Sequence, residues 1–187
     1  MSTTSNSMLQ MMVYIDEQYV PATSLKTQQH LDNISAWTTQ NLMKLNTDKT
    51  NYMVFSRSEK EFATRLTLDG NTIDRVEETK LVGVWLTTWL DWEKNTREIC
   101  KKAYARMTMI TKFRYVGVST DDLLHIYILY IRSLLEYCSV VWHSTLTGEQ
   151  SQDIEKVQKL CLKIILGEHY SGYEEALEYC DLDSLSA

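Results

Sequence analysis

The sequence predicts an α+β protein that is predominantly helical, with a long N-terminal helix, a small antiparallel β-hairpin unit and a C-terminal helical bundle. Three observations lead to this prediction. Apolar residues recur at three- to four-residue steps over most of the chain. Short β-prone runs separated by turn residues are confined to residues 51–86. One proline and six glycines in 187 residues are too few for a loop-rich β-sandwich.

The N-terminal part contains the first predicted helix. Residues 1–22 are polar and weakly patterned, and Pro21 ends them. A helical pattern begins at Ser24, and residues 46–50 break it as a turn. The apolar residues that carry this pattern are Leu31, Ile34, Trp37 and Leu42.

The β-prone runs follow this helix. Residues 51–55 and 65–68 are the first two, and Asp69-Gly70 is a hairpin signal that residues 72–76 complete with a return strand. Residues 79–86 form a third β-rich run that contains Gly83. A glycine inside a strand indicates a bulge or a close approach by another backbone.

The second half is helical throughout. A helix is predicted over residues 91–113, with one apolar face, and a second begins at Ser119 and continues to about Trp142. The second is apolar on nearly all sides, so we expect it to be the central, buried helix. Two more are predicted over residues 148–166, ending at Gly167, and over residues 173–179. The apolar positions predicted to face inward from the first and third are Trp92, Ile99, Ala103, Met107, Ile110, Ile154, Val157, Cys161 and Ile165.

These elements predict three regions. Residues 1–22 are a weakly structured segment, residues 23–88 an α+β unit, and residues 89–187 a helical bundle, with the boundary near residues 87–90. The four cysteines lie far apart without a CxxC pair, and we interpret them as reduced core residues. The N-terminus has no positive charge ahead of an apolar core, and residues 123–141 are interrupted by His125, Arg132 and Glu136. We therefore expect no signal peptide, no membrane contact, and a location in the nucleus or cytoplasm.

The charge of the chain is unevenly distributed. The net charge of -6 argues against a wholly basic nucleic-acid-binding protein. Residues 91–115, however, carry seven basic and three acidic side chains, a local charge of +4 that leaves -10 elsewhere. At about 100° per residue, four of the basic side chains fall within roughly 60° of one another on a helix: Lys94, Arg97, Lys101 and Lys112. They form either a solvated helix face or a surface laid along a phosphate backbone.

Five segments in order carry a family resemblance. They are LDNISAWTTQNLMKLNTDKTNYMVF, ETKLVGVWL, CKKAYARM, YIRSLLEYCSVVWHS and DIEKVQKLCLKIILG. Together they resemble the part of non-LTR (LINE-type) retrotransposon reverse transcriptases that follows the catalytic YxDD motif. The resemblance covers about residues 23–185.

The resemblance implies roles for particular residues. Lys49, in the turn after the first helix, resembles a lysine that can protonate the departing pyrophosphate, although a lysine in a turn is commonly only solvated. The primer grip, which holds the end of the growing strand, is resembled by Leu81, Val82, Gly83 and Val84. The helices from Asp91 onward resemble the thumb, which contacts the backbone of an RNA–DNA hybrid or of DNA or RNA. The side chains expected to make these contacts are Lys94, Arg97, Lys101, Lys102 and Lys112.

The metal-binding part of such a polymerase is missing from the sequence. Polymerase chemistry requires two Mg²⁺ ions held by carboxylates. The YxDD position has only Val13-Tyr-Ile-Asp16-Glu17, in which glutamate replaces the second aspartate. Asp16 is at most a relic of a metal ligand. We expect no metal or cofactor in this chain, no polymerisation by the chain alone, and a partner in the missing palm and fingers.

Two other interpretations stay open. The chain is a non-enzymatic interaction or nucleic-acid-binding module if the aromatic side chains of residues 127–142 lie at a surface rather than in a core. Its C-terminal half is also similar to a module at the N-terminus of an AlkB-type 2-oxoglutarate-dependent hydroxylase and tRNA methyltransferase. The iron of that class needs an HxD…H triad. His30-Leu-Asp32 has these letters but lies in a predicted helix, and no Gly-rich loop follows a strand.

Overall fold

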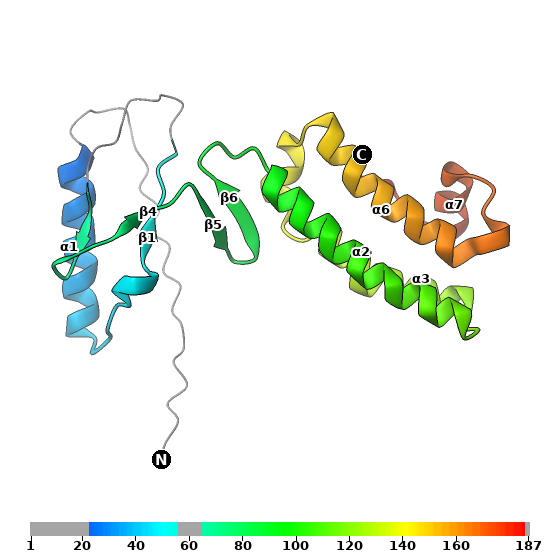
Figure 1. Ribbon diagram of the computed structural model, residues 1–187, viewed down its shortest axis with the longest axis horizontal. Coiled ribbons are helices and arrows are strands. Elements are labelled where there is room, and N and C mark those ends of the chain that lie inside the picture. The colour runs from blue at the N-terminus through cyan, green and yellow to red at the C-terminus, as the bar shows by residue number, and fades with distance from the viewer. Residues whose placement is uncertain (1–22, 56–64, 186–187) are drawn as a thin grey trace, which may run out of the picture. The chain divides into compact units, whose positions relative to one another are not determined.

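The computed structural model describes residues 23–55 and 65–185 and divides the chain into two compact units. Among the described residues, 23–54 and 65–76 belong to the first unit, and residues 55 and 77–185 to the second. The chain is α+β and mostly helical, and the strands of the described part pair into three two-stranded sheets (Figure 1). This division differs from the expected boundary near residues 87–90, because the second hairpin lies against a helix of the second unit.

The first unit contains one helix and four very short strands. Its hairpin turns at Asp69 and Gly70, whose φ angles are 51° and 78°, as the Asp-Gly signal predicted. The return segment divides, since its second part pairs in parallel with the strand at Asn51. The elements are α1 (Thr23–Gln40), η1 (Thr47–Lys49), β1 (Asn51–Tyr52), β2 (Thr67–Leu68), β3 (Asn71–Thr72) and β4 (Asp74–Arg75).

A small apolar core holds the first unit together. Leu66, Leu68 and Ile73 are buried in it. The Gln28 amide joins α1 to β2, because its Nε2 donates to the Thr67 carbonyl at 2.8 Å and its Oε1 accepts from the Thr67 amide at 2.9 Å. The apolar pattern predicted for this helix continues past its end. Trp37 is 49% exposed, and Leu42 is 97% exposed in a left-handed conformation after α1.

The second unit begins with the hairpin of β5 (Glu78–Leu81) and β6 (Val84–Thr87). Its turn is Val82-Gly83, with φ angles of 44° and 90°. Residues 79–86 were expected to be one β-rich run with a bulge or a close backbone approach at Gly83, and they form two strands instead, because Gly83 supplies the left-handed conformation of a two-residue turn. The close approach to this glycine comes from a side chain, the ring of Tyr137, and the Tyr137 hydroxyl donates to the Val82 carbonyl at 3.0 Å.

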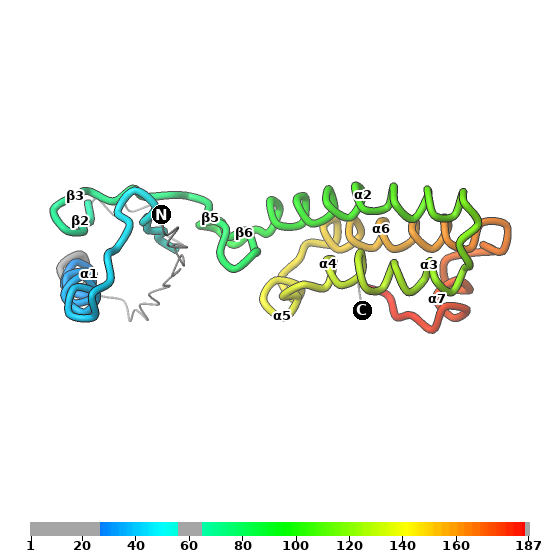
Figure 2. Tube along the Cα trace, turned by 90° about the horizontal axis from the view of Figure 1, so that it is seen from below, coloured from blue at the N-terminus to red at the C-terminus, as the bar shows by residue number. Residues whose placement is uncertain are grey.

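Helices make up the rest of the second unit. Figure 2 shows α2, α6 and the segment α3–α4 running alongside one another, in agreement with their contacts. The helical elements are α2 (Glu93–Tyr115), α3 (Thr120–Tyr127), the π-helical turn η2 (Ile128–Arg132), α4 (Ser133–Leu135), α5 (Ser139–Trp142), η3 (His143–Thr145), α6 (Gly148–Leu166), η4 (Gly167–His169) and α7 (Tyr173–Cys180). Their main core contains the inward faces predicted from the sequence. Its buried residues are Val84, Trp92, Ile99, Cys100, Ala103, Met107, Ile110, Leu123, Tyr127, Ile131, Leu135, Trp142, Ile154, Val157, Cys161 and Ile165.

Caps define the helix ends that the sequence predicted. The Ser119 hydroxyl accepts from the Asp122 amide and starts α3. Thr147 and Gln150 form a capping box at the start of α6, which ends at Gly167 with φ 57°. The cysteines are all free; Cys100, Cys161 and Cys180 are buried, and Cys138 is half-buried.

The segment predicted as one central helix is broken and partly exposed. A π-helical turn at Ile128–Arg132 and a left-handed residue at Cys138, with φ 54°, interrupt it. Leu129 is 74% exposed and Val140 is 94% exposed, so the expectation of a buried central helix was wrong.

The same segment is apolar enough to qualify as a membrane span. Against the sequence-based expectation, Thr120–Thr145 passes by length and composition, with a mean hydropathy of 1.3 and 17% of the window buried. Its main chain changes direction at Cys138, and an ion pair of 2.8 Å joins Arg132 to Glu136 within it. Its buried members, such as Tyr127 and Trp142, pack into the core of the helical unit.

Candidate nucleic-acid interface

The start of α2 is fixed by contacts with η3 and with the first turn of α6. Trp92 is buried in a left-handed conformation, and its indole Nε1 donates to the Thr145 hydroxyl at 2.7 Å. The Gln150 side-chain Nε2 donates to the Asp91 carbonyl at 2.7 Å. The Asp91 carboxylate in turn accepts from the Glu93 amide at 3.1 Å, in place of a Ser or Thr cap. These contacts orient the helix that carries most of the predicted interface.

Four of the five predicted basic side chains are exposed on α2, and Lys94 is the exception. Its ammonium group bonds to the Glu78 carboxylate of β5 and lies 3.8 Å from the centroid of the Trp85 ring. Lys94 therefore fastens α2 to the hairpin, by an ion pair and a cation–π contact. The four exposed side chains are Arg97, Lys101, Lys102 and Lys112.

Lys102 lies on a different side of α2 from the other exposed cations. The positive charge of Lys80, on β5, is the main cause that lowers the pKa of the Lys102 ammonium. Two ammonium groups that repel each other are stabilised by an anion between them. Sequence reasoning missed Lys80, because only the folded hairpin brings it beside Lys102.

The primer-grip-like residues are the end of β5, the turn, and the start of β6. Val82 at the turn is 67% exposed, whereas Val84 is buried in the core. The hairpin is anchored to α2 by Asn95, whose buried Oδ1 accepts from the Trp85 amide at 3.1 Å. The hairpin and α2 thus form one supported surface.

The other predicted functional residues lie elsewhere. Lys49 is exposed in η1 of the first unit, where its amide donates to the Asn46 side chain. Asp16 lies outside the described residues. His30 and Asp32 are exposed and two residues apart on α1, so they do not face each other. Within residues 23–55 and 65–185, no group of three or more His, Cys, Asp and Glu side chains could hold a metal ion.

A groove between α2 and α6 is a feature that sequence reasoning missed. It has a volume of about 340 Å³. The available signal was the spacing of lysines at i, i+3 and i+7 on α6, which places them on one side of the helix. The residues that line the groove are Tyr104, Lys156, Lys159, Leu160, Lys163 and Tyr170.

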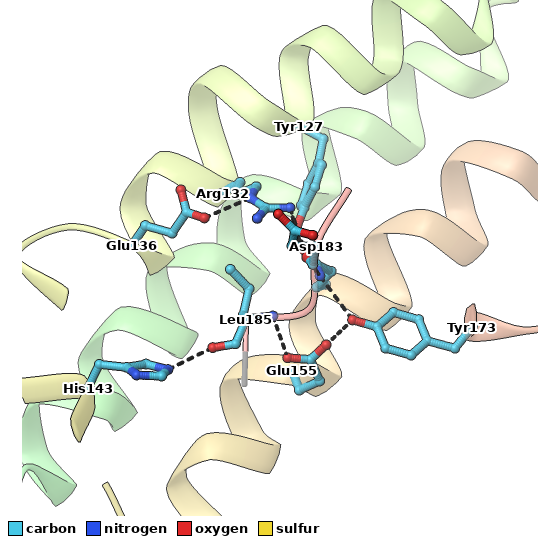
Figure 3. Close-up of polar contacts among 9 residues, drawn as sticks. Tyr127, Arg132, Glu136, His143, Glu155, Tyr173, Asp183 and Leu185 are labelled. Atoms are coloured by element: carbon cyan, nitrogen blue, oxygen red, sulfur yellow. Dashed lines mark hydrogen bonds and ion pairs between the residues drawn. The ribbon is translucent and has the colours of Figure 1, made fainter. Parts of the chain in front are cut away.

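A buried polar network holds the helical unit together away from these surfaces (Figure 3). Gln158 is fully buried, and its Oε1 accepts from the Tyr127 hydroxyl at 2.6 Å. Its Nε2 donates to the Tyr173 hydroxyl at 2.9 Å and to the Asp183 carbonyl at 3.0 Å. Burial is the main cause that raises the pKa of Tyr127, so its hydroxyl stays protonated as a donor.

The same network binds the last described residues to α6, η2 and η3. The Glu155 carboxylate accepts from the Leu185 amide at 2.9 Å and from the Tyr173 hydroxyl. His143 Nε2 lies 2.8 Å from the Leu185 carbonyl, and Arg132 donates to the Asp183 carbonyl at 3.1 Å (Figure 3). Each of these polar groups is engaged with the protein itself, which indicates a structural role for the network.

The helical unit thus presents exposed cations on α2 and α6, together with exposed aromatic side chains such as Tyr104 and Tyr115. Comparison with models of protein families, with curated proteins and with solved structures finds no match for this chain.

Proposed function

We propose that the helical unit binds nucleic acid through the phosphodiester backbone, as the thumb-like part of a non-LTR retrotransposon reverse transcriptase. The ordered sequence segments support the relationship, and the fold supports the binding. The observation that carries the binding is the row of exposed cations along α2: Arg97, Lys101 and Lys112. We refer to these three side chains as the α2 row.

The α2 row matches the dimensions of a nucleic-acid strand. At 1.5 Å per residue, Arg97 and Lys112 are about 22 Å apart along the helix. A strand of a duplex has one phosphate per about 3.4 Å of its axis, so the row spans roughly six phosphates. Each neutralised phosphate releases counterions, which makes the binding dependent on salt.

The cations of the α2 row are available to phosphates. In the part of the chain that the structure describes, neither Lys101 nor Lys112 forms an ion pair. Arg97 lies 3.7 Å from Glu93, and both side chains are more than 60% exposed, at 64% and 76%. An exposed pair of this kind is worth little, so Glu93 does not hold Arg97 against a phosphate.

Lys80 and Lys102 extend the proposed interface onto the hairpin. A phosphate beside Lys102 would offset the positive charge of Lys80 that lowers the pKa of Lys102. In this proposal the turn at Val82-Gly83 contacts the end of a growing strand, and Tyr137 supports the turn from behind. The primer-grip role and the α2 row would then act on one nucleic acid.

In this proposal the chain is one part of a polymerase and does not polymerise nucleotides alone. The Mg²⁺ ions and their carboxylates would belong to a palm supplied by another segment or partner. Only in such an assembly would Lys49 protonate pyrophosphate. The nucleus or cytoplasm is the compartment that this function implies.

The test of the proposal is fluorescence anisotropy with a labelled RNA–DNA hybrid at 50–200 mM salt. Lys101→Glu with Lys112→Glu should weaken binding and reduce the salt slope by about two, since each lost phosphate contact reduces it by about one. Lys44→Glu with Arg65→Glu makes the same charge change at exposed sites of the first unit and should leave the slope unchanged. An unchanged slope in the first variant would show that the α2 row does not bind the hybrid.

Exposed aliphatic side chains favour a second candidate function, a protein interaction module. Leu129, Val140 and Val141 are 74%, 94% and 54% exposed. Exposed apolar side chains favour association when they are contiguous. Sedimentation velocity tests this candidate: self-association that Val140→Asp abolishes supports it, and a wild-type chain that stays monomeric at high concentration excludes self-association through this surface.

A further inference from the structure

We propose that the groove between α2 and α6 binds an unpaired nucleotide, with its base against Tyr104 and its phosphates at the lysines of α6. The proposal takes its ligand class from the proposed function but uses different side chains. The volume of about 340 Å³ lies at the lower end of the range for small-ligand sites, which fits one base rather than a base pair. Figure 2 shows the two helices side by side.

The walls of the groove offer apolar and aromatic surface from both helices. Tyr104 on α2 is 40% exposed, and Leu160 on α6 is 42% exposed. An aromatic ring stacks with any base, because every base has a flat π face. Burial, followed by the neighbouring Cys100 and Asp153, raises the pKa of Tyr104. The hydroxyl therefore stays neutral and does not repel a phosphate.

The lysines of the groove differ in how far their charges are compensated. Lys156 Nζ lies 2.7 Å from the Asp153 carboxylate, which raises the pKa of Lys156 and offsets part of its charge. The Lys159 ammonium lies 5.0 Å from the centroid of the Tyr173 ring, without a carboxylate partner among the described residues. The Lys163 side chain likewise has no ion pair in this part of the chain. Lys159 and Lys163 are thus the cations available to the phosphates.

One end of the groove is held in place by a contact across the helices. Gly167 has a φ of 57°, and the Arg114 guanidinium occupies the position that a Cβ would take. Arg114 also donates to the Ile165 carbonyl at the end of α6. The turn η4 then brings Tyr170 to the groove, with its amide donating to the Gly167 carbonyl at 3.1 Å. A site formed in advance loses less entropy when a ligand binds.

The groove and the α2 row use different side chains, although they share part of one side of α2. At about 100° per residue, Arg97 lies about 20° around α2 from Tyr104 but two turns earlier along the helix, Lys101 about 60° and Lys112 about 80°. Because a base inside a duplex is stacked and paired, only a single-stranded nucleotide can insert its base. The groove therefore favours a single strand, while the α2 row contacts a hybrid.

The experiment compares two strands of equal charge. Fluorescence anisotropy at fixed salt measures the affinity of the full chain for a labelled ten-nucleotide oligothymidylate and for an abasic strand with the same number of phosphates. The wild-type chain should bind the strand with bases about tenfold tighter, the effect of one stacked base. Tyr104→Leu keeps apolar bulk but removes the ring, so this ratio should fall to about one while abasic affinity is unchanged.

Tyr115→Leu is the matched control. Tyr115 lies on the same helix, is 91% exposed, and does not line the groove. This variant should keep the wild-type ratio. Circular dichroism melting curves confirm that each variant is folded.

Three outcomes would overturn the proposal. In the first, the wild-type chain binds the oligothymidylate and the abasic strand with equal affinity. In the second, Tyr104→Leu keeps the wild-type ratio of the two affinities. In the third, decaglutamate competes with the oligothymidylate as effectively as the abasic strand does, and Tyr104→Leu changes none of these affinities. The last result identifies a site for acidic peptides. If the hybrid still binds through the α2 row while the ratio is one, only this inference fails. If the ratio is tenfold and the hybrid does not bind, the proposed function fails instead.

Discussion

The two units of the chain differ in how much apolar surface they bury. Among the described residues, the core of the first unit has three buried side chains, Leu66, Leu68 and Ile73, and each of its strands is two residues long. The core of the second unit extends from Val84 to Ile165 and includes two fully or nearly fully buried large aromatic residues, Tyr127 and Trp142. Two-stranded sheets of this length are not stable without packing support. The helical unit therefore carries most of the folding energy of the described chain.

The largest expected effect tests the core of the helical unit. Trp142→Ala should lower the free energy of unfolding by about 3–5 kcal/mol, because it removes a large buried side chain and leaves a cavity. Trp37→Ala makes the same change at a 49% exposed site of the first unit and should change the free energy of unfolding of that unit by less than about 0.5 kcal/mol. Urea unfolding followed by circular dichroism measures both. Equal losses of unfolding free energy in the two variants would contradict the conclusion that the core of the helical unit carries most of the folding energy.

The second prediction concerns the buried polar network. Gln158→Leu should lower the free energy of unfolding by about 2–3 kcal/mol, because the Tyr127 hydroxyl and the Asp183 carbonyl lose a buried partner. Gln152→Leu, at an exposed position of the same helix, should change it by less than about 0.5 kcal/mol. Both values come from urea unfolding at pH 7. A Gln158 variant as stable as the wild type would show that the network contributes nothing to the fold.

The third prediction concerns how the stability of the helical unit depends on pH. All four cysteines belong to this unit. Burial raises the pKa of the Cys161 thiol from its ordinary value of 9.0 to about 12. Below pH 9 the thiol is neutral in both states. Between pH 9 and 12 the unfolded chain loses the proton and the folded chain keeps it. The free energy of unfolding should therefore fall as pH rises through this range, by about 1.4 kcal/mol per pH unit.

The check is urea unfolding of the wild-type chain and of Cys161→Ala at pH 8, 9 and 10. The variant is less stable throughout, because it loses buried volume. Its decline above pH 9 should be shallower than that of the wild-type chain by the amount that one thiol contributes. Parallel declines would show that Cys161 ionises alike in both states.

The smallest expected effect on stability comes from substitutions in the two hairpin turns. Gly70→Ala should cost about 1 kcal/mol, the conformational cost of a left-handed residue, since no atom lies within 4 Å of an added Cβ. Gly83→Ala should cost more, because its Cβ would lie 3.2 Å from the ring of Tyr137. Amide hydrogen exchange in β2–β3 and β5–β6 measures the two costs. A larger effect at Gly70 would contradict the support that Tyr137 gives to the second turn.

Local signals in the sequence predicted the parts of the fold that depend on few residues. The hairpin at Asp69-Gly70, the cap at Ser119 and the helix of residues 148–166 are confirmed, because turns, caps and apolar periodicity act within a few residues. The segment after Ser119 was predicted wrongly. Its apolar residues surround the helix, so periodicity shows neither the π-helical turn nor the change of direction at Cys138.

The candidate site was only partly predictable for a related reason. The exposed cations of α2 follow from helical spacing alone. The packing of the hairpin against α2 determines two further features. It forms the ion pair between Lys94 and Glu78, and it places Lys80 beside Lys102. The groove at Tyr104 depends on two helices that are far apart in the sequence. Contacts of this kind are set by tertiary packing, which one-dimensional patterns do not contain.

Tyr137 has a consequence for the cooperativity of unfolding. Its carbonyl accepts from the Trp142 indole at 3.0 Å, and its hydroxyl donates to the Val82 carbonyl at the tip of the hairpin. The left-handed residue that follows, Cys138, turns the chain so that both contacts form. One residue thus couples the hairpin tip, through its side chain, to the indole at the centre of the helical core, through its main chain. The hairpin and the core should open together, as a single cooperative unit.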